Sequence, residues 1–171
     1  PAAGHLRLFF DDDWRSLQVA DSYGHDIEAS WLLWEAAELH DDTDLHAQIK
    51  RVAVQLAGAV YADGRDTDGS IFYEGGPDGI TEDDKSWWVP AEGMVGFTNA
   101  YQLSGYDRFM AAARACWDYI QAKHIDRMHG GWFKLLDRDG NLLSPYKVDP
   151  WACPYHNSRA CLEMMDRLGM D

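Results

Sequence analysis

Positive charge is scarce in this sequence of 171 residues: 15 Lys and Arg residues stand against 29 Asp and Glu residues, and the net charge is −14. Proteins that bind nucleic acids or anionic membrane surfaces present patches of Lys and Arg, so the composition argues against both kinds of partner. The sequence also has no apolar run of about 18 residues, the length that a membrane-spanning helix needs. We therefore expect no membrane span and an acidic, solvated surface.

Cysteine is rare as well. The sequence contains Cys116, Cys153 and Cys161, an odd number with neither a CxxC spacing nor a Cys/His spacing typical of metal sites. This usage is typical of free, buried thiols in a reducing compartment. We therefore expect no metal and a cytoplasmic location.

Aromatic residues, in contrast, are abundant: the chain has 8 Trp, 8 Tyr and 6 Phe. The length suits a single domain, residues 1–171, with a sizeable core, and some of the rings belong to that core. The surplus predicts a surface on which rings stack against a planar or sugar-like ligand.

Apolar periodicity and helix-terminating residues predict five helices. Thr43 and Asp107 are expected to cap the second and the fourth, and Gly105 is expected to end the third. The predicted helices are 26–40, 44–63, 90–104, 107–123 and 154–168.

Short β segments are expected between these helices. An aromatic stretch at 6–20 that ends in loop residues predicts a short hairpin, and 71–73 reads as a strand. Asp139-Gly140 between apolar runs predicts a second hairpin.

The predicted helices form a repeat. Leu39, Leu103 and Leu168 end equivalent helices, and Glu28 and Glu92 hold equivalent positions in the first two of them. Each unit consists of a first helix with unusual polar residues, an amphipathic second helix and a β insert, and such hairpins stack into solenoids or close into rings. We therefore predict an all-α fold of helical-hairpin repeats, more than half helical, with no sheet larger than a small hairpin.

Three polar and aromatic clusters mark the starts of the first helices in successive units. They are His25, Glu28 and Trp31; Trp87, Trp88 and Glu92; and Trp151, Tyr155, His156 and Asn157. Each cluster has an ordinary explanation as a helix cap, as compensation of the helix dipole or as core tryptophan. A single pocket where these helix ends meet explains all three together, and we favour that interpretation.

Two histidines that converge from different helices suit a two-base reaction. One imidazole removes a weakly acidic C–H proton and the other delivers a proton to the opposite face, because histidine titrates near neutral pH. The alternative chemistry is glycoside hydrolysis by the paired carboxylates of Glu28 and Glu92, which leaves both histidines without a role.

The segments that carry these clusters resemble the cellobiose 2-epimerases of the N-acylglucosamine 2-epimerase superfamily. The matching stretches are Ser22 to Trp31, Trp87 to Glu92, Asp149 to Trp151 and Cys153 to Asn157, within a likeness from about Leu6 to Leu168. The resemblance implies that the chain is the C-terminal half of an (α/α)6 barrel with short β-hairpin inserts, and that the N-terminal half of the same barrel is its partner. The family reaction is the reversible C2 epimerisation of the reducing-end sugar of β-1,4-linked disaccharides (cellobiose, lactose or mannobiose) through a cis-enediolate, without a metal or other cofactor.

The resemblance also implies roles for individual residues. His25 and His156 correspond to the two acid/base catalysts. Glu28 and Glu92 correspond to carboxylates that support them and bind sugar hydroxyls. The substrate-binding set implied in this way is Glu28, Trp31, Trp88, Glu92 and Trp151.

Rival functions stay open at this stage. Within the superfamily, N-acylglucosamine 2-epimerases and mannose-type aldose–ketose isomerases share the enediolate chemistry. A sugar-binding fragment without activity belongs to a different class, and a glycosidase is a third possibility.

Overall fold

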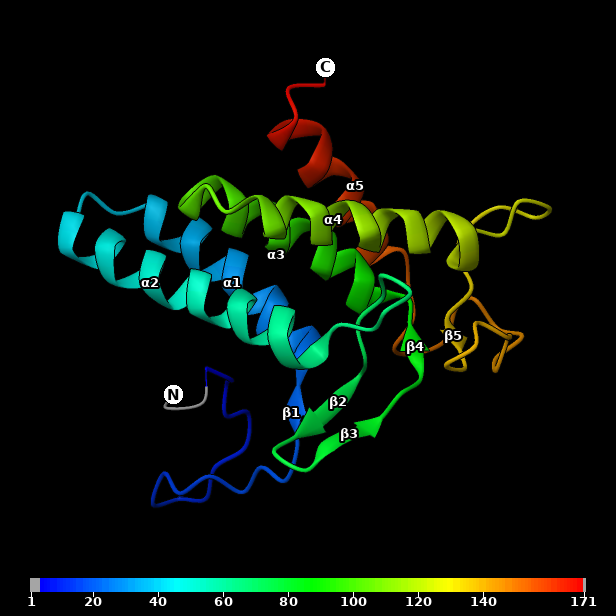
Figure 1. Cartoon of the computed structure of the whole chain (residues 1–171), viewed down its shortest axis with the longest axis horizontal. Coiled ribbons are helices and arrows are strands. Elements are labelled where there is room, and N and C mark those ends of the chain that lie inside the picture. Colours follow the sequence, from blue (N-terminus) through cyan, green and yellow to red (C-terminus); the bar gives the residue numbers. More distant parts are fainter. Residues whose placement is uncertain (1–3, 171) are drawn as a thin grey trace.

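A computed structural model describes residues 4–170 of the chain, and helices make up 51% of the described residues. Figure 1 shows two antiparallel helical hairpins that lie side by side and a fifth helix that projects from them. The predicted all-α hairpin fold is confirmed. The helices are α1 (Tyr23–Glu38), α2 (Thr43–Ala59), α3 (Trp88–Ser104), α4 (Asp107–Tyr119) and α5 (Tyr155–Arg167).

The repeat is visible in how the hairpins end. Helix α2 runs on into a π-helical turn at Val60–Gly64, and α4 runs on into an equivalent turn at Ile120–His124. A short bridged loop follows each turn, closed by the pairs Arg65–Ile71 and Ile125–Trp132. The second helices were predicted to reach residues 63 and 123 without this change of helix type.

The strands are short and antiparallel. Strands β1 (Asp21–Ser22), β2 (Glu74–Gly76) and β3 (Gly79–Glu82) form one sheet in that order, which is one strand larger than the predicted hairpins. The predicted strand 71–73 is wrong in position, because β2 begins at Glu74 and only Ile71 of the earlier stretch makes a bridge.

The other two predicted hairpins are present in reduced form. The stretch 6–20 turns back on itself through the pair Phe10–Ser16. Strand β5 (Leu135–Leu136) pairs with β4 (Lys85–Ser86), and Leu136 also bridges to Leu142 across the turn that contains Gly140. A φ angle of 85° at Gly140 explains why this turn carries glycine.

Two predicted caps are wrong and one predicted helix end is confirmed. Asp42, not Thr43, caps α2 by accepting hydrogen bonds from the backbone N–H groups of Asp44 and Leu45. Helix α4 has no side-chain cap, because Asp107 already lies inside it. Gly105 ends α3 in the left-handed conformation with a φ of 73°.

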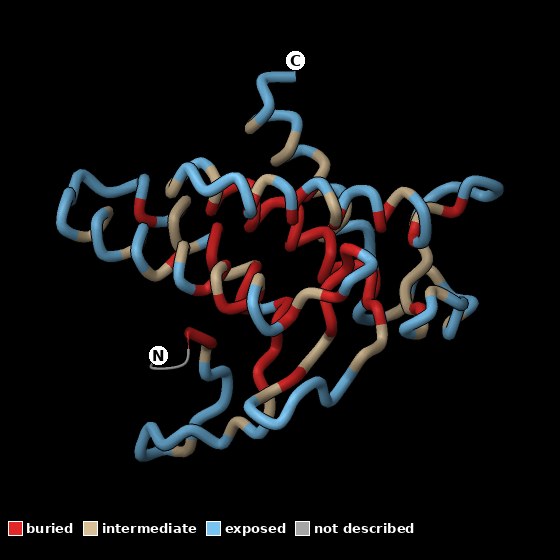
Figure 2. Tube along the Cα trace, viewed as in Figure 1, coloured by how far each residue is buried: buried red, intermediate tan, exposed pale blue. Residues whose placement is uncertain are grey.

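Helix α3 forms the centre of the core. It packs against α1, α2, α4 and α5, and every residue from Trp88 to Ala100 is buried (Figure 2). A side chain at Gly96 is excluded because its Cβ would lie 2.6 Å from the carbonyl oxygen of Ile27 in α1. The backbones of α1 and α3 therefore approach closely, which brings their N-terminal ends together.

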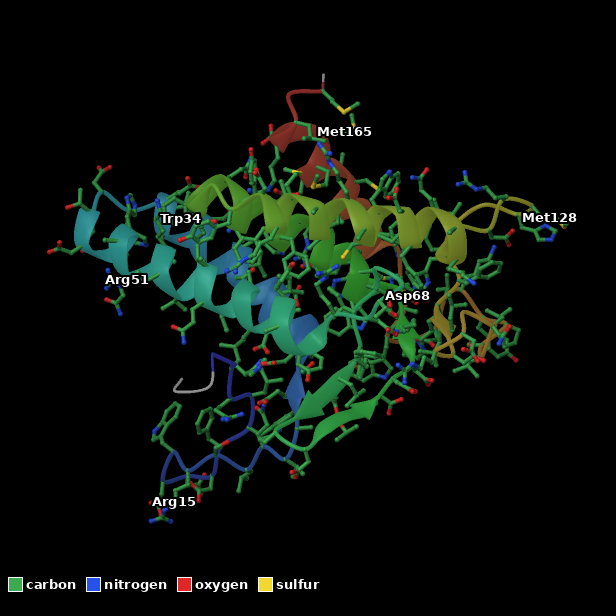
Figure 3. The ribbon with its side chains drawn as sticks, viewed as in Figure 1. Arg15, Trp34, Arg51, Asp68, Met128 and Met165 are labelled. Atoms are coloured by element: carbon green, nitrogen blue, oxygen red, sulfur yellow. The ribbon has the colours of Figure 1, made fainter. Side chains whose placement is uncertain are left out.

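Helix α5 is packed on one side only. Ala160 is its single buried residue, and Met165 lies beyond the layer formed by the two hairpins (Figure 3). No helix in residues 4–170 is long and apolar enough to cross a membrane.

The three cysteines are free thiols, as predicted, but only Cys116 is buried. Burial raises the pKa of the Cys116 thiol to about 12. Cys153 is exposed and Cys161 is half-buried, so the expectation of burial is wrong for these two. Both lie in or beside α5, which has few neighbours.

Candidate active site

The N-terminal ends of α1, α3 and α5 meet at an open cavity of about 660 Å³. Its polar and aromatic lining comes from these helices, from the strands and from the loop before α5. The lining residues are His25, Glu28, Tyr73, Glu82, Asp84, Ser86, Trp87, Trp88, Lys134, Leu135, Trp151 and His156.

His156, at the start of α5, is held by a carboxylate. Its Nδ1 lies 2.6 Å from Oε1 of Glu92 and 3.9 Å from Oε1 of Glu28. With Nδ1–H donated to Glu92, the other ring nitrogen, Nε2, is the one left for proton transfer. The imidazole also contacts Trp88, at 5.3 Å between ring centroids.

Glu92 lies beneath the cavity floor and is completely buried. One carboxylate oxygen accepts a hydrogen bond from the indole Nε1–H of Trp31 at 3.0 Å. The other oxygen accepts from His156 and, at 2.7 Å, from the guanidinium of Arg159. The charge of this buried carboxylate is thus fully hydrogen bonded, as burial of a charge requires.

Arg159 on α5 joins the carboxylates of two other helices. Its guanidinium donates to Glu28 of α1 at 2.5 Å and to Glu92 of α3 at 2.7 Å, and it stacks on the ring of Trp31 at 4.8 Å. Burial lowers the pKa of Arg159, but the hydrogen bonds with Glu28 and Glu92 outweigh this effect and raise it. The sequence interpretation missed this residue.

His25, in the first turn of α1, lies on the exposed side of the cavity. Its Nδ1 is 2.8 Å from the hydroxyl oxygen of Ser22, and its ring lies 5.0 Å from that of Trp88. Gly24 makes this approach possible, because a Cβ there would lie 2.3 Å from the Trp88 ring. Both imidazoles therefore contact the same indole.

The loop before α5 brings a further aromatic ring to the cavity. Trp151 is 87% exposed and lines the cavity wall. Asp149 accepts hydrogen bonds from the backbone N–H groups of Trp151 and Ala152, both at 2.8 Å, and pairs with Lys134. The hydrogen bond from Lys134 is the main cause of the lowered pKa of Asp149.

Two further acidic side chains, Glu82 and Asp84, line the cavity. Burial and the neighbouring charges of Asp84 and Glu74 raise the pKa of Glu82. Burial also raises the pKa of Tyr73, whose ring meets Trp88 edge-on. The cavity therefore offers hydroxyl, carboxylate and amine groups around flat rings, a combination suited to a polyhydroxylated ligand.

Five of the seven residues predicted for the site line this one cavity: His25, Glu28, Trp88, Trp151 and His156. Trp31 and Glu92 do not. Trp31 is only 1% exposed and Glu92 is completely buried, so neither side chain faces this cavity, and the substrate contacts expected of them stay a prediction. Both lie below the cavity surface. There the indole N–H of Trp31 donates a hydrogen bond to Glu92, and Glu92 in turn is hydrogen bonded to the imidazole of His156.

One cluster has the spacing of a cation site. Potential ligand atoms of Glu28, Glu92 and His156 all lie within 4.8 Å of one another. The guanidinium of Arg159 already supplies positive charge to both carboxylates, so the chemistry of the cluster is satisfied by an arginine and we do not assign a metal to it.

Comparison with known sequences gives a consistent family. A family model described as N-acylglucosamine 2-epimerase (GlcNAc 2-epimerase) matches residues 2–160. The cellobiose 2-epimerase of Bacteroides fragilis is 42% identical over 163 residues, which cover 94% of this chain and 41% of that protein. The cellobiose 2-epimerase of Dictyoglomus turgidum is 40% identical over 166 residues, which cover 96% of this chain and 42% of that protein. The chain thus spans well under half the length of these curated relatives.

Solved structures match the fold closely. A sugar epimerase from a ruminal bacterium has a TM-score of 0.91 and 36% identity, with 98% of this chain and 43% of that chain covered. Cellobiose 2-epimerase from Bacillus thermoamylovorans has a TM-score of 0.87 and 37% identity, with 96% and 42% covered. A D-mannose isomerase matches with a TM-score of 0.85 at 19% identity, which shows a shared fold alone. The hairpins of this chain are accordingly part of an (α/α)6 barrel.

Proposed function

The chain belongs to the N-acylglucosamine 2-epimerase family, and we propose that it carries the two-histidine part of an active site that epimerises the reducing-end sugar of β-1,4-linked disaccharides at C2. The observation that carries the proposal is the placement of His25 and His156. They come from helices far apart in the sequence, yet both line one cavity and both contact Trp88.

The proposed reaction moves one proton and leaves the composition of the sugar unchanged. After ring opening, one histidine removes the proton from C2 and the electron pair forms a cis-enediolate with the C1 carbonyl. The other histidine then donates a proton to the opposite face of C2. In both histidines Nδ1 is hydrogen bonded, to Ser22 and to Glu92 respectively, so Nε2 is the nitrogen proposed to exchange the proton.

The residues that line the cavity support the proposed sugar substrate. Trp88 and Trp151 offer flat faces to the apolar sides of sugar rings, and Glu28 offers a carboxylate to a hydroxyl group. The cellobiose 2-epimerases match at higher identity than the N-acylglucosamine 2-epimerase of Bos taurus, which is 28% identical over 154 residues. This difference favours a disaccharide over an N-acylated monosaccharide as substrate.

The remaining part of the barrel is proposed to complete the site. Because the chain covers 43% of the ruminal sugar epimerase structure, we propose that the N-terminal half of the same barrel closes the cavity and supplies further substrate contacts. We also propose a cytoplasmic location, because three free thiols fit a reducing compartment.

One experiment separates the candidate functions. The full-length protein that contains this chain is incubated with cellobiose in heavy water and followed by NMR. An epimerase produces the C2 epimer with deuterium at C2, an isomerase produces a ketose, a glycosidase releases glucose, and a sugar-binding protein produces none of these. Any product other than the deuterated C2 epimer contradicts the proposal.

Two variants test the histidines. His25→Phe and His156→Phe should each lower the rate of C2 exchange by about 10²–10⁴-fold, the usual contribution of a general acid or base. His40→Phe is the matched control, because His40 is exposed beyond the far end of α1. Near-normal exchange in His156→Phe leaves that residue with a structural role only.

A further inference from the structure

Two arginines on α5 make parallel contacts with the same pair of helices. Arg159 reaches Glu28 of α1 and Glu92 of α3. Two turns further on, Arg167 reaches Glu35 of α1 at 2.7 Å, and Gln102 and Asn99 of α3 at 2.8 and 3.2 Å. The guanidinium groups lie 4.8 Å and 6.0 Å from the ring of Trp31. Both arginines therefore join α5 to the hairpins, but only Arg159 touches groups that contact a proposed catalytic base.

The surroundings of Arg159 are unusual for a surface arginine. Its side chain is 17% exposed, and of its two carboxylate partners Glu92 is fully buried and Glu28 is 17% exposed. Neither Arg159 nor Glu92 is among the residues that line the cavity. Any influence of Arg159 on chemistry must therefore pass through His156 or Glu28.

We propose that Arg159 is a positioning residue of the epimerase site, which neutralises Glu92 and Glu28 so that His156 can be unprotonated when it has to accept a proton. The inference rests on the proposed function. In this proposal Arg159 has two roles: it attaches α5 to the hairpins, as Arg167 does, and it also sets the charge around His156, which Arg167 does not.

Charged groups from three helices surround His156 and its carboxylate partners. Helix α1 contributes Glu28, helix α3 contributes Glu92, and α5 itself contributes Arg159 and the adjacent Tyr155 ring. The other titratable side chains that line the same cavity are His25, Tyr73, Glu82, Asp84 and Lys134.

Without the guanidinium of Arg159, the carboxylates of Glu28 and Glu92 would keep only the imidazole of His156 as a nearby group that can carry positive charge. A nearby opposite charge typically shifts the titration of a group by one to three pH units, and burial strengthens the effect. The proton would then be held on His156 at neutral pH. A protonated imidazole cannot act as the base, so exchange at C2 would need a higher pH.

Arg159→Met in the full-length protein tests this, with Arg167→Met as the matched control. In Arg159→Met, the acid limb of the pH–rate profile for C2 exchange should move to higher pH by at least about one unit, with the lost rate partly recovered above neutral pH. Arg159→Lys keeps a positive charge and should leave the limb close to its wild-type position. Arg167→Met should lower the Tm and leave the limb unmoved.

A second measurement does not depend on activity. The ring of His156 is titrated by NMR in the wild type and in Arg159→Lys and Arg159→Met, and its midpoint should be higher in Arg159→Met. Equal midpoints, or a loss of rate in Arg159→Met that is uniform across pH, overturn the proposal and leave Arg159 a packing role like that of Arg167. Should the wild type fail to exchange the C2 proton, the proposed function fails, and the NMR midpoints still decide whether Arg159 controls protonation of His156.

Discussion

At the scale of single residues, Trp31 shows what helical spacing does and does not predict. His25, Glu28 and Trp31 are three positions apart, a spacing that predicts adjacent positions on one surface of a helix. Their burial nevertheless differs: His25 is exposed, Glu28 is half-buried and Trp31 is buried. Spacing predicts which residues share a face, but the depth of each depends on α3 and α5, which pack over that face.

Trp31→Phe tests the hydrogen bond between Trp31 and the buried carboxylate of Glu92. The substitution keeps an aromatic ring but removes the N–H that Glu92 accepts. A hydrogen bond to a charged group contributes about 1.5–3 kcal/mol, so we expect a lower Tm and a C2 exchange rate reduced by about tenfold or more. Trp34→Phe is the control, because Trp34 packs against His46 of α2, away from the cavity. An unchanged rate in Trp31→Phe would mean that Glu92 needs only His156 and Arg159.

His124 predicts a pH dependence of stability. Burial lowers its pKa to about 4, while Nδ1 donates to the carbonyl of Phe133 and Nε2 is buried without a partner in the described structure. In the unfolded chain the His124 imidazole takes up a proton near pH 6.5, whereas in the folded chain it does so only near pH 4. The contribution of the neutral imidazole to the free energy of unfolding is therefore fully present above pH 6.5 and is lost as the pH falls towards 4. At about 1.4 kcal/mol per pH unit, the loss amounts to roughly 3 kcal/mol.

The measurement compares urea unfolding of the wild type and of His124→Gln at pH 7 and at pH 4.5. Their difference in free energy of unfolding should shrink at the lower pH, because only the wild type carries an imidazole that is protonated in the unfolded state and kept neutral in the folded state. A constant difference contradicts the assignment.

Arg159, to which we assign a positioning role, is the residue near the proposed site that the sequence interpretation most clearly missed. It follows His156 by three positions, so both lie on one face of α5, and that spacing was the available signal. An arginine on an amphipathic helix is most often solvated, and nothing in the sequence shows that two carboxylates from α1 and α3 meet it. The contacts of Arg159 depend on the three-dimensional arrangement of three helices.

At the scale of elements, helix positions were predictable and helix ends were less so. The apolar periodicity of α1 to α5 located each helix to within three residues at its start. Asp42 and Thr43 both offer a capping oxygen, and the choice between them depends on which residue has the extended backbone, here Asp42 with a φ of −126°. The π-helical turns after α2 and α4 leave no mark in a pattern with a period of 3.6 residues.

Gly96→Ala tests the close packing of α1 on α3. The new Cβ would meet backbone of α1 at 2.6 Å, so the helices must separate, and we expect destabilisation of about 1–3 kcal/mol as in other overpacked cores. Gly58→Ala is the control: Gly58 lies in α2 with no atom within 4 Å of an added Cβ, and alanine there should stabilise the protein by about 0.5–1 kcal/mol. The test is chemical denaturation of both variants, and a stabilised Gly96→Ala would contradict this packing.

At the scale of the whole molecule, one part of the surface is strongly apolar. An apolar groove of about 500 Å³ lies between α3, α4 and α5. Its lining is rich in methionine and comprises Met94, Met110, Ala113, Arg114, Trp117, Cys161, Met164, Met165, Leu168 and Met170. The hairpin repeat predicted the paired helices correctly, whereas the partial barrel was implied by the family resemblance, and no pattern within this chain identifies the residues of the other part.

Residues 1–171 expressed alone should therefore be inactive and prone to associate. An exposed apolar surface of this kind favours self-association, and the proposed site lacks the rest of its barrel. Light scattering should detect assemblies larger than a monomer, and NMR should detect no epimer of lactose. A monomer that steadily converts lactose to its C2 epimer would show that the site is complete within these residues. The full-length protein serves as the positive control.

The distance in sequence between the two imidazoles has a consequence for protein synthesis. His25 and Glu28 leave the ribosome before Glu92, and His156 and Arg159 follow only with α5. Translation that stops between residues 93 and 155 yields a polypeptide with one of the two proposed bases and with the Glu92 carboxylate deprived of both partners from α5. Such a product lacks the second base that the proposed exchange at C2 requires. Abortive translation products are therefore expected to be catalytically silent, and a nonsense mutation late in this reading frame should be as damaging as an early one.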